Sequence, residues 1–352
     1  MTSTARLVEV HRLAVAGHEA EIASVVGDLV GRVWLARSRF ADVVRLAEQT
    51  LTLGEDAGAL YDLGWAKRIT GFPMEALAAY DRALDLFRAG HHRGNESATL
   101  TSIGLVYDGL GDRQQALNYY GQALPIVREV GDRAGEATTL NNIGSVHDAL
   151  GDTRQALDYY GQALRIRREV GDRGGEAVTL SNIGLVHNRS GRPRRALDYY
   201  GQALPLMREV GDRAGEATTL NNIGTAHNEL GDRQQALNYF GQALPIRREV
   251  GDRAGEASTL SNIGLVYDNM GDLQRALDYY GQALPIVREI GDRASETITR
   301  YNLAVTYRQL GELALAVAEL ERVVELDRQV GHPDLEADTA TLERLRREQA
   351  GS

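Results

Sequence analysis

Apolar residues recur every three or four positions along most of this chain, which is the spacing of helices that bury one face. In one stretch, the residues expected on a common face are Leu140, Ile143, Gly144, His147 and Leu150. In the stretch that follows, the corresponding residues are Ala156, Leu157, Tyr160, Ala163 and Leu164. Several of these residues are small, so the pattern predicts two amphipathic helices that approach each other closely.

Glycine-aspartate pairs separate the predicted helices. The most regular stretches of 40 residues carry two such pairs, as at Gly131-Asp132 and Gly151-Asp152. Glycine tolerates the left-handed conformation that ends a helix, and aspartate accepts backbone N–H groups at the start of the next helix. Asp112, Asp152 and Asp232 also have Gln three residues later, which is the spacing of a capping box. The chain therefore alternates helix and turn.

The two-helix pattern repeats every 40 residues from Leu51 onward without insertions. One helical hairpin cannot cover its own apolar face, so neighbouring hairpins must stack. We expect an all-α solenoid of stacked antiparallel helix pairs, with N-terminal helices and a degenerate repeat in residues 1–50 and a capping helix in residues 331–352. The seven predicted repeats are residues 51–90, 91–130, 131–170, 171–210, 211–250, 251–290 and 291–330.

Four prolines fall inside predicted second helices, each four residues after a glycine. They are Pro125, Pro205, Pro245 and Pro285. Proline lacks an N–H and crowds the carbonyl four residues earlier. The matching residue of another repeat is Arg165, and the pattern downstream is the same. We therefore expect these helices to bend at proline and to continue.

Composition narrows the classes of function. The chain lacks cysteine, which excludes disulfides and thiolate metal sites, and its net charge of −10 disfavours nucleic acid as a partner. We see no apolar run of about 18 residues and no secretory signal, so we expect no membrane association and a cytoplasmic location. Phosphate-loop, zinc-hydrolase and serine-hydrolase motifs are absent from the sequence. We therefore expect neither enzymatic activity nor a cofactor.

The residues at Leu140, Ile143, Gly144 and His147, followed by those at Ala156, Tyr160 and Ala163, resemble the tetratricopeptide repeat. The longer period of 40 and the string Leu-Asn-Asn-Ile-Gly at 140–144 and 220–224 are similar to the kinesin-light-chain type, found also in bacterial signalling proteins. This resemblance implies a right-handed superhelix whose first helices line a concave surface that binds a peptide.

Asparagine recurs on the face of the first helices opposite the apolar stripe. Asparagine forms helices poorly, so we expect exposed amides that hold the backbone of an extended peptide. The expected peptide-binding residues are Asn141, Asn142, Asp148, Asn182, Asn188, Asn221, Asn222, Asn228, Asn262, Asp268 and Asn302. The resemblance singles out the asparagine two residues before the small residue, where Ser102 breaks the pattern. Specificity is expected from neighbours that vary, including Asp108, Arg189, Glu229 and Arg308. The alternative is that duplication copied these amides and that some bond a neighbouring repeat.

Two further groups have a structural and a functional interpretation. His147, His187 and His227 recur every 40 residues. Equivalent positions of stacked repeats lie about 10 Å apart, which is too far for ligands of one metal ion, so we interpret these histidines as core residues. Arg189, Arg192, Arg194 and Arg195 form a basic cluster, which is either a solvated turn or a docking point for an acidic partner.

The leading hypothesis is a scaffold or receptor that binds a protein or peptide, acting as a monomer or weak homo-oligomer. One alternative is a sensor module that works with a signalling ATPase or a transcription regulator. Another is a solenoid that assembles end to end.

Overall fold

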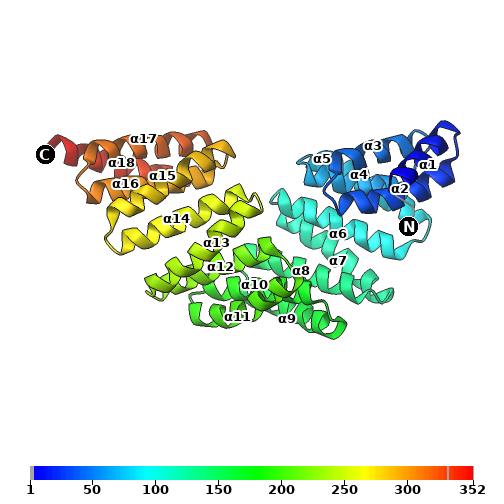
Figure 1. The fold of residues 1–352 in the computed structure, drawn as a ribbon, viewed down its shortest axis with the longest axis horizontal. Helices are drawn as coiled ribbons and strands as arrows, with labels where there is room; N and C mark the ends of the chain where they lie inside the picture. The colour runs from blue at the N-terminus through cyan, green and yellow to red at the C-terminus, as the bar shows by residue number, and fades with distance from the viewer. Residues whose placement is uncertain (1–3, 331–332, 352) are drawn as a thin grey trace. The chain divides into compact units, whose positions relative to one another are not determined.

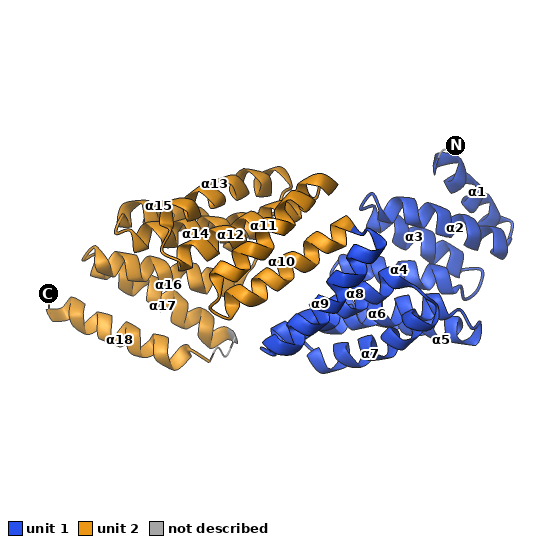
Figure 2. Cartoon of the chain, turned by 90° about the horizontal axis from the view of Figure 1, so that it is seen from below, with its two compact units in different colours: residues 1–172 blue, residues 173–352 orange. Residues whose placement is uncertain are grey.

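Helices make up all of the regular secondary structure in the described part of the chain (Figure 1). The computed structural model describes residues 4–330 and 333–351. The helices fall into two compact units, residues 1–172 and residues 173–352 (Figure 2). The prediction of an all-α fold is therefore confirmed. Across the described residues, each helix is too short or too polar to cross a membrane.

The first unit contains nine of the described helices. They are α1 Thr4–Ala16, α2 Ala20–Leu35, α3 Phe40–Leu51, α4 Ala57–Ile69, α5 Pro73–Ala89, α6 Arg93–Gly109, α7 Arg113–Glu129, α8 Arg133–Ala149 and α9 Thr153–Val170. From α4 onward, each even-numbered helix packs most extensively on the helix that follows it. The even-numbered helices α2, α4, α6 and α8 also contact one another in order, so they form one layer of the unit.

The second unit repeats this arrangement with the remaining nine described helices. They are α10 Arg173–Arg189, α11 Pro193–Val210, α12 Arg213–Glu229, α13 Arg233–Glu249, α14 Arg253–Asn269, α15 Leu273–Glu289, α16 Arg293–Gln309, α17 Leu313–Val330 and α18 Leu335–Gly351. The helices α10, α12, α14 and α16 form its even-numbered layer. The last helix, α18, packs on α17 and buries Leu342 and Leu345.

In most of the turns, a glycine-aspartate pair ends one helix and caps the start of the next. After α6, Gly111 has a φ of 84° and donates its N–H to the carbonyl of Asp108, while Asp112 donates to the carbonyl of Tyr107. These two bonds are those of a Schellman motif. The carboxylate of Asp112 then accepts the N–H of Gln115 in α7. The two residues of the turn thus satisfy backbone carbonyls at the end of α6 and a backbone N–H at the start of α7.

The same turns correct two expectations. A capping box does not form, because the N–H of Asp112 or Asp152 is already bound to the helix before it. Asp232 makes no side-chain cap at all. Leu150, expected in the apolar core, is 55% exposed, because α8 ends at Ala149 and leaves Leu150 in the turn.

Within a helix pair, an aromatic ring lies directly against a glycine. A Cβ added to Gly144 would lie 2.9 Å from Cδ1 of Tyr160, which is closer than real Cβ contacts. The same contact joins Gly224 to Phe240, and it recurs in the other pairs from α4–α5 to α14–α15. In α16 the glycine is replaced by Ala304, and the ring by Leu320. The small residue therefore sets how closely the two helices approach.

The prolines do not end their helices. Pro125 lies inside α7, which continues to Glu129, and Pro205 lies inside α11, which continues to Val210. The expectation that these helices continue is confirmed.

A buried glutamate joins successive pairs. Glu256, at the start of α14, is 6% exposed and accepts hydrogen bonds from Nε of Arg248 in α13 and Nη1 of Arg253, both at 2.7 Å. Nη2 of Arg253 donates in turn to Glu289 of α15 at 2.7 Å. We call this set of two arginines and two glutamates the clasp. It recurs around Glu136 and Glu216, and it connects three consecutive helices.

The glycine-ring contact predicts that Gly144→Ala destabilises the first unit by about 1–3 kcal/mol, because the added methyl meets the ring of Tyr160. In a Tyr160→Leu background, which copies the Ala304–Leu320 pair, the same substitution is expected to be neutral or stabilising. Urea unfolding followed by tryptophan fluorescence measures this, since Trp34 and Trp65, the two tryptophans of the chain, lie in this unit. An equal cost in both backgrounds would contradict the steric explanation.

The clasp predicts an acid-sensitive contribution to stability. Burial raises the pKa of Glu256, but hydrogen bonds from Arg248 and Arg253 outweigh it, so that pKa lies below its usual 4.5. A lowered pKa stabilises the fold above the unfolded-state value, and this stabilisation disappears as the pH falls. Glu256→Gln should therefore cost about 1–3 kcal/mol at pH 7 and much less at pH 3. Urea unfolding at both pH values tests this, and Glu289→Gln, at the exposed end of Arg253, should cost under about 1 kcal/mol.

Candidate functional site

The amides predicted to bind a peptide fall into two groups. Some bond to the next helix of the even-numbered layer, and others are half-buried without a side-chain partner in the described residues. In the even-numbered layer of the second unit, Oδ1 of Asn221 accepts hydrogen bonds from Thr259 and from Nδ2 of Asn262, each at 3.2 Å. Hydroxyl pairs occupy related positions, with Thr101 and Thr139 3.4 Å apart and Ser181 and Thr219 also 3.4 Å apart. A polar seam therefore joins successive even-numbered helices.

The expectation that all of these asparagines are exposed is wrong for three of them. Asn141, Asn188 and Asn221 are each only 8% exposed. Asn221 faces the following helix of the layer, and Nδ2 of Asn188 donates to Glu229 at 2.8 Å. Burial raises the pKa of the Glu229 carboxyl, and the hydrogen bond from Asn188 opposes that shift. For Asn188, Asn221 and Asn262, the hypothesis of a bond to the neighbouring repeat is the one that the contacts support.

Several other predicted binding and specificity residues also contact neighbours within their unit. Asp268 accepts a hydrogen bond from Thr306 at 3.1 Å, and Asp108 pairs with Arg113 at 3.1 Å. Arg308 donates to both carboxylate oxygens of Glu348 in α18. These side chains support the stacking of helices in the structure.

Four of the predicted amides remain without a hydrogen-bond partner for their side chains in the described residues. They are half-buried and lie on α8, α12 and α16: Asn142, Asn222, Asn228 and Asn302. Of the other predicted residues, Asp148 and Asn182 are half-buried, and Arg189 is exposed.

The recurring histidines stack on tyrosines of their own helix pairs. Ring centroids are 5.4 Å apart for His147 and Tyr159, and 5.3 Å apart for His187 and Tyr199. His227 stacks in the same way on Tyr239. Within residues 4–330 and 333–351, no group of three histidine or carboxylate side chains is arranged to hold a metal ion. The basic cluster has Arg192, Arg194 and Arg195 exposed around the turn before α11.

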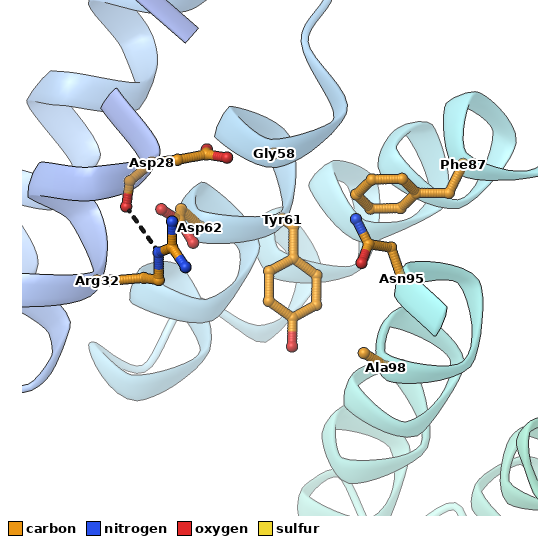
Figure 3. A pocket seen from close by; sticks show the side chains of 8 residues that line it. All are labelled: Asp28, Arg32, Gly58, Tyr61, Asp62, Phe87, Asn95 and Ala98. Atoms are coloured by element: carbon orange, nitrogen blue, oxygen red, sulfur yellow. Dashed lines mark hydrogen bonds between the residues drawn. The ribbon is translucent and has the colours of Figure 1, made fainter. Parts of the chain in front are cut away.

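A pocket that the sequence analysis missed lies between α2, α4 and α6 in the first unit (Figure 3). Its volume is about 310 Å³. Charged side chains gather on one side of it, and aromatic and amide side chains lie on the other (Figure 3). The lining consists of Asp28, Arg32, Gly58, Tyr61, Asp62, Phe87, Asn95 and Ala98.

Glycines allow the two carboxylates to lie between the helices. A Cβ on Gly31 of α2 would lie 2.4 Å from the carboxylate of Asp62, and a Cβ on Gly58 of α4 would lie 2.7 Å from that of Asp28. Each carboxylate thus rests on a glycine of the opposite helix. Arg32, the nearby cation, donates from Nε to the backbone carbonyl of Asp28 at 3.3 Å and forms no ion pair with either carboxylate.

The pocket is lined by two carboxylates and only one cationic side chain. Desolvation, followed by the charge of Asp28, raises the pKa of Asp62 to about 7, although Arg32 opposes this. Desolvation and the charge of Asp56 raise the pKa of Asp28. Asp56 itself is held by Ser24 and by the N–H of Ala59 at the start of α4. A cation entering the pocket would therefore find a carboxylate that lacks a donor in the described residues.

Sequence reasoning missed this pocket because it lies where the 40-residue period is lost. Asp28 and Asp62 are 34 residues apart, so they do not align in the repeat that begins at Leu51. In the sequence, Asp28 and Asp62 are recognisable only as acidic residues in helices that also contain or lie near Gly31 and Gly58.

Comparison with known structures shows the same architecture elsewhere. A Rap protein complexed with competence and sporulation factor superposes with a TM-score of 0.61 at 17% identity, covering 99% of this chain and 98% of the other. A signal transduction ATPase with a tetratricopeptide repeat sensor, from Pyrococcus horikoshii, superposes with a TM-score of 0.66 at 15% identity, covering 93% of this chain and 52% of the other. BtubC from P. vanneervenii gives 0.55 at 23% identity, covering 61% and 91%. These likenesses show a shared fold.

No curated protein sequence matches this chain significantly. The model of the tetratricopeptide repeat, in contrast, matches residues 55–129, 110–169, 175–249 and 255–329. These ranges cover most of the chain and include the helix pairs, the glycine-ring contacts and the turns described above. Such repeats form, in general, a non-catalytic scaffold for protein interactions. This chain belongs to the tetratricopeptide repeat family.

Proposed function

We propose that this protein binds a polypeptide partner and that a basic side chain of this partner enters the pocket between α2, α4 and α6. The observation that carries this proposal is the carboxylate of Asp62, which faces a second carboxylate and has no hydrogen-bond donor in the described residues. An arginine or lysine would supply both the missing charge and the missing donors.

The shape and the walls of the pocket suit a long basic side chain. Tyr61 and Phe87 present aromatic surface, which attracts cations and covers methylene groups. Asn95 adds an amide that can donate to a peptide carbonyl. A volume of about 310 Å³ leaves room for one side chain, but not for a folded domain. The partner therefore enters by a single residue and lies against the even-numbered layer with its neighbouring residues.

The amides without side-chain partners are suited to bind the backbone of a peptide. Asn142 lies on α8 of the first unit, and Asn222, Asn228 and Asn302 lie on α12 and α16 of the second. Because an amide offers both a donor and an acceptor, it can bind peptide backbone of any sequence. We propose that Asn142, rather than the buried Asn141, forms an amide contact to this peptide in the first unit. Within the second unit taken by itself, we propose Asn222, Asn228 and Asn302, rather than the buried Asn188 and Asn221, as amide contacts to a polypeptide.

A sensor that responds to a peptide also works by binding of this kind. In one of the similar structures, the repeats are the sensor of a signal transduction ATPase. We propose that a corresponding role here would use the same pocket, with the peptide as the signal.

The pocket is tested with blocked octapeptides that carry arginine or the neutral isostere citrulline at a fixed position among randomised residues. We expect the arginine set to bind at least about tenfold more tightly, because a charge-assisted bond contributes about 1.5–3 kcal/mol. Asp62→Asn should abolish this preference, whereas Asp85→Asn, at an exposed site on α5, should preserve it. Binding should strengthen between pH 6 and pH 8, roughly the range in which Asp62 ionises. Equal binding of both sets would disprove the proposal.

The two kinds of amide are separated by a matched pair of substitutions. Asn221→Ala should destabilise the second unit by about 1–3 kcal/mol, because it leaves Thr259 and Asn262 without their acceptor. Asn142→Ala, in the unit that holds the pocket, should change the free energy of unfolding by less than about 0.5 kcal/mol and weaken peptide binding instead. Urea unfolding by circular dichroism and fluorescence anisotropy with the arginine set measure the two effects. If Asn142→Ala binds the peptides as the parent does, the amide has no part in binding.

A further inference from the structure

One turn of the second unit lacks the carboxylate that caps its counterparts. Before α15, the carboxylate of Asp272 accepts the backbone N–H of Arg275 at 3.3 Å. In the turn between α10 and α11 the equivalent residue is Arg192, and no side chain caps the start of α11. Two more arginines, Arg194 and Arg195, follow in the first turn of that helix. Three cationic side chains thus surround a helix start that has no carboxylate of its own.

The backbone at the start of α11 has two N–H groups without an acceptor in the described residues. The first residue of the helix, Pro193, has no N–H, and the N–H of Ala196 already binds the carbonyl of Arg192 at 3.1 Å. The N–H groups of Arg194 and Arg195 lie between these two positions, where a helix leaves donors unsatisfied. Such donors and the helix dipole both favour an anion.

The surroundings of this turn do not neutralise its three arginines. Their side chains are exposed, and none of them pairs with a carboxylate in residues 4–330 or 333–351. Asp198, one turn further along α11, is also exposed. Glu229 of α12 accepts a hydrogen bond from Asn188, and Asp232 lies 3.5 Å from Nδ1 of His227. The turn is therefore locally positive in a chain whose net charge is −10.

A buried histidine faces the same turn. His187 of α10 is 6% exposed, and its Nδ1 has no hydrogen-bond partner in the part of the chain that the structure describes. In the next repeat, Nδ1 of His227 lies 3.5 Å from the carboxylate of Asp232. Both histidines stack on a tyrosine in the same way, and in both turns the residue after glycine donates its N–H to the histidine carbonyl at 2.9 Å. Nδ1 of His187 therefore points to the position that a carboxylate occupies in the equivalent turn.

The charges of the turn act directly on this histidine. Burial lowers the pKa of His187, and the charges of Arg192 and Arg195 lower it further. Both guanidinium groups thus lie close to the ring, with no anion between them. The ring, the guanidinium groups and the two backbone N–H groups would all be stabilised by one negatively charged group in the turn.

We propose that this turn binds a phosphoryl group, which takes the place of the aspartate carboxylate of the other turns. On a side chain, a phosphoryl group carries a charge of about −1.5 to −2 at pH 7 and three acceptor oxygens. It can accept both backbone N–H groups and pair with the guanidinium groups around it. A single carboxylate has only one negative charge and would leave two of the three arginines without a counter-charge. This site lies within the second unit and does not depend on the pocket of the first.

The experiment tests two sources of the phosphoryl group on the full chain, labelled with ¹⁵N in its histidines. The probes are inorganic phosphate and a blocked pentapeptide with one phosphoserine among glycine and glutamine residues. NMR follows the ring signal of His187 at constant ionic strength, with chloride as the balancing anion. The signal is identified by its absence from His187→Tyr, which copies the tyrosine at Tyr267.

A saturable shift of the His187 signal is expected with either probe. A tighter fit to the peptide would assign the site to a phosphorylated polypeptide, and saturation by inorganic phosphate alone would assign it to the free ion. Either result supports the proposal. If neither probe shifts the signal beyond the effect of chloride, the proposal is wrong.

The chemical class of the anion is tested with two matched pentapeptides, in which serine or glutamate replaces phosphoserine. The phosphoserine peptide should bind at least about tenfold more tightly than the glutamate peptide, because it makes more charge-assisted bonds. The serine peptide should leave the His187 signal unchanged. Equal binding of the glutamate and phosphoserine peptides would contradict the assignment to a phosphoryl group.

Three variants locate the site. Arg192→Asp restores the residue of the other turns and should abolish the phosphoryl-dependent shift. Arg195→Gln should weaken binding at least about tenfold. Arg233→Gln changes an exposed arginine in the next equivalent turn, which keeps Asp232, and should bind as the parent does. Circular dichroism confirms that each variant is folded, and unchanged binding by folded Arg192→Asp or Arg195→Gln overturns the proposal.

Discussion

The contact between a glycine and an aromatic ring is the constraint on which the rest of this structure depends. Because Gly144 has no side chain, the ring of Tyr160 packs against the backbone of α8, and the two helices of a pair come together at one distance. The same contact in the neighbouring pairs gives them nearly the same shape. Identical pairs stack in identical ways, and this explains why the seam and the clasp recur at a fixed interval. Where Ala304 and Leu320 replace the glycine and the ring, the regular contacts also change.

The helices and turns were predictable from sequence because their causes are local. A positive φ at Gly111 and a cap by Asp112 follow from properties of those residues alone. The direction of Asn221 was not predictable, because it depends on how far one helix pair rotates relative to the next. Asn221 and Asn222 are adjacent in sequence, yet one is buried in the seam and the other is half-buried and has no partner within the described chain.

The clasp and the pocket show two other limits of sequence reasoning. Glu256 looks like one of many surface carboxylates, and only the spacing of Arg248 and Arg253 around it distinguishes the buried position. The pocket of α2, α4 and α6 arises where the period fails, so comparison between repeats gives no information about Asp62. Both candidate binding sites lie at irregular parts of the array. This is physically reasonable, because a regular repeat satisfies its own polar groups and leaves little for a ligand to supply.

The clasp has a consequence for the history of the chain. Its arginines and glutamates reach from the end of one helix pair into the next pair and no further. Unequal recombination between two copies of the coding repeat would therefore remove or add 40 residues and still leave every carboxylate beside an arginine of the right geometry. The array can therefore gain or lose whole 40-residue repeats without passing through an unstable intermediate. The last repeat differs, since Arg300 and Glu319 bind each other there and have no equivalent in the other repeats.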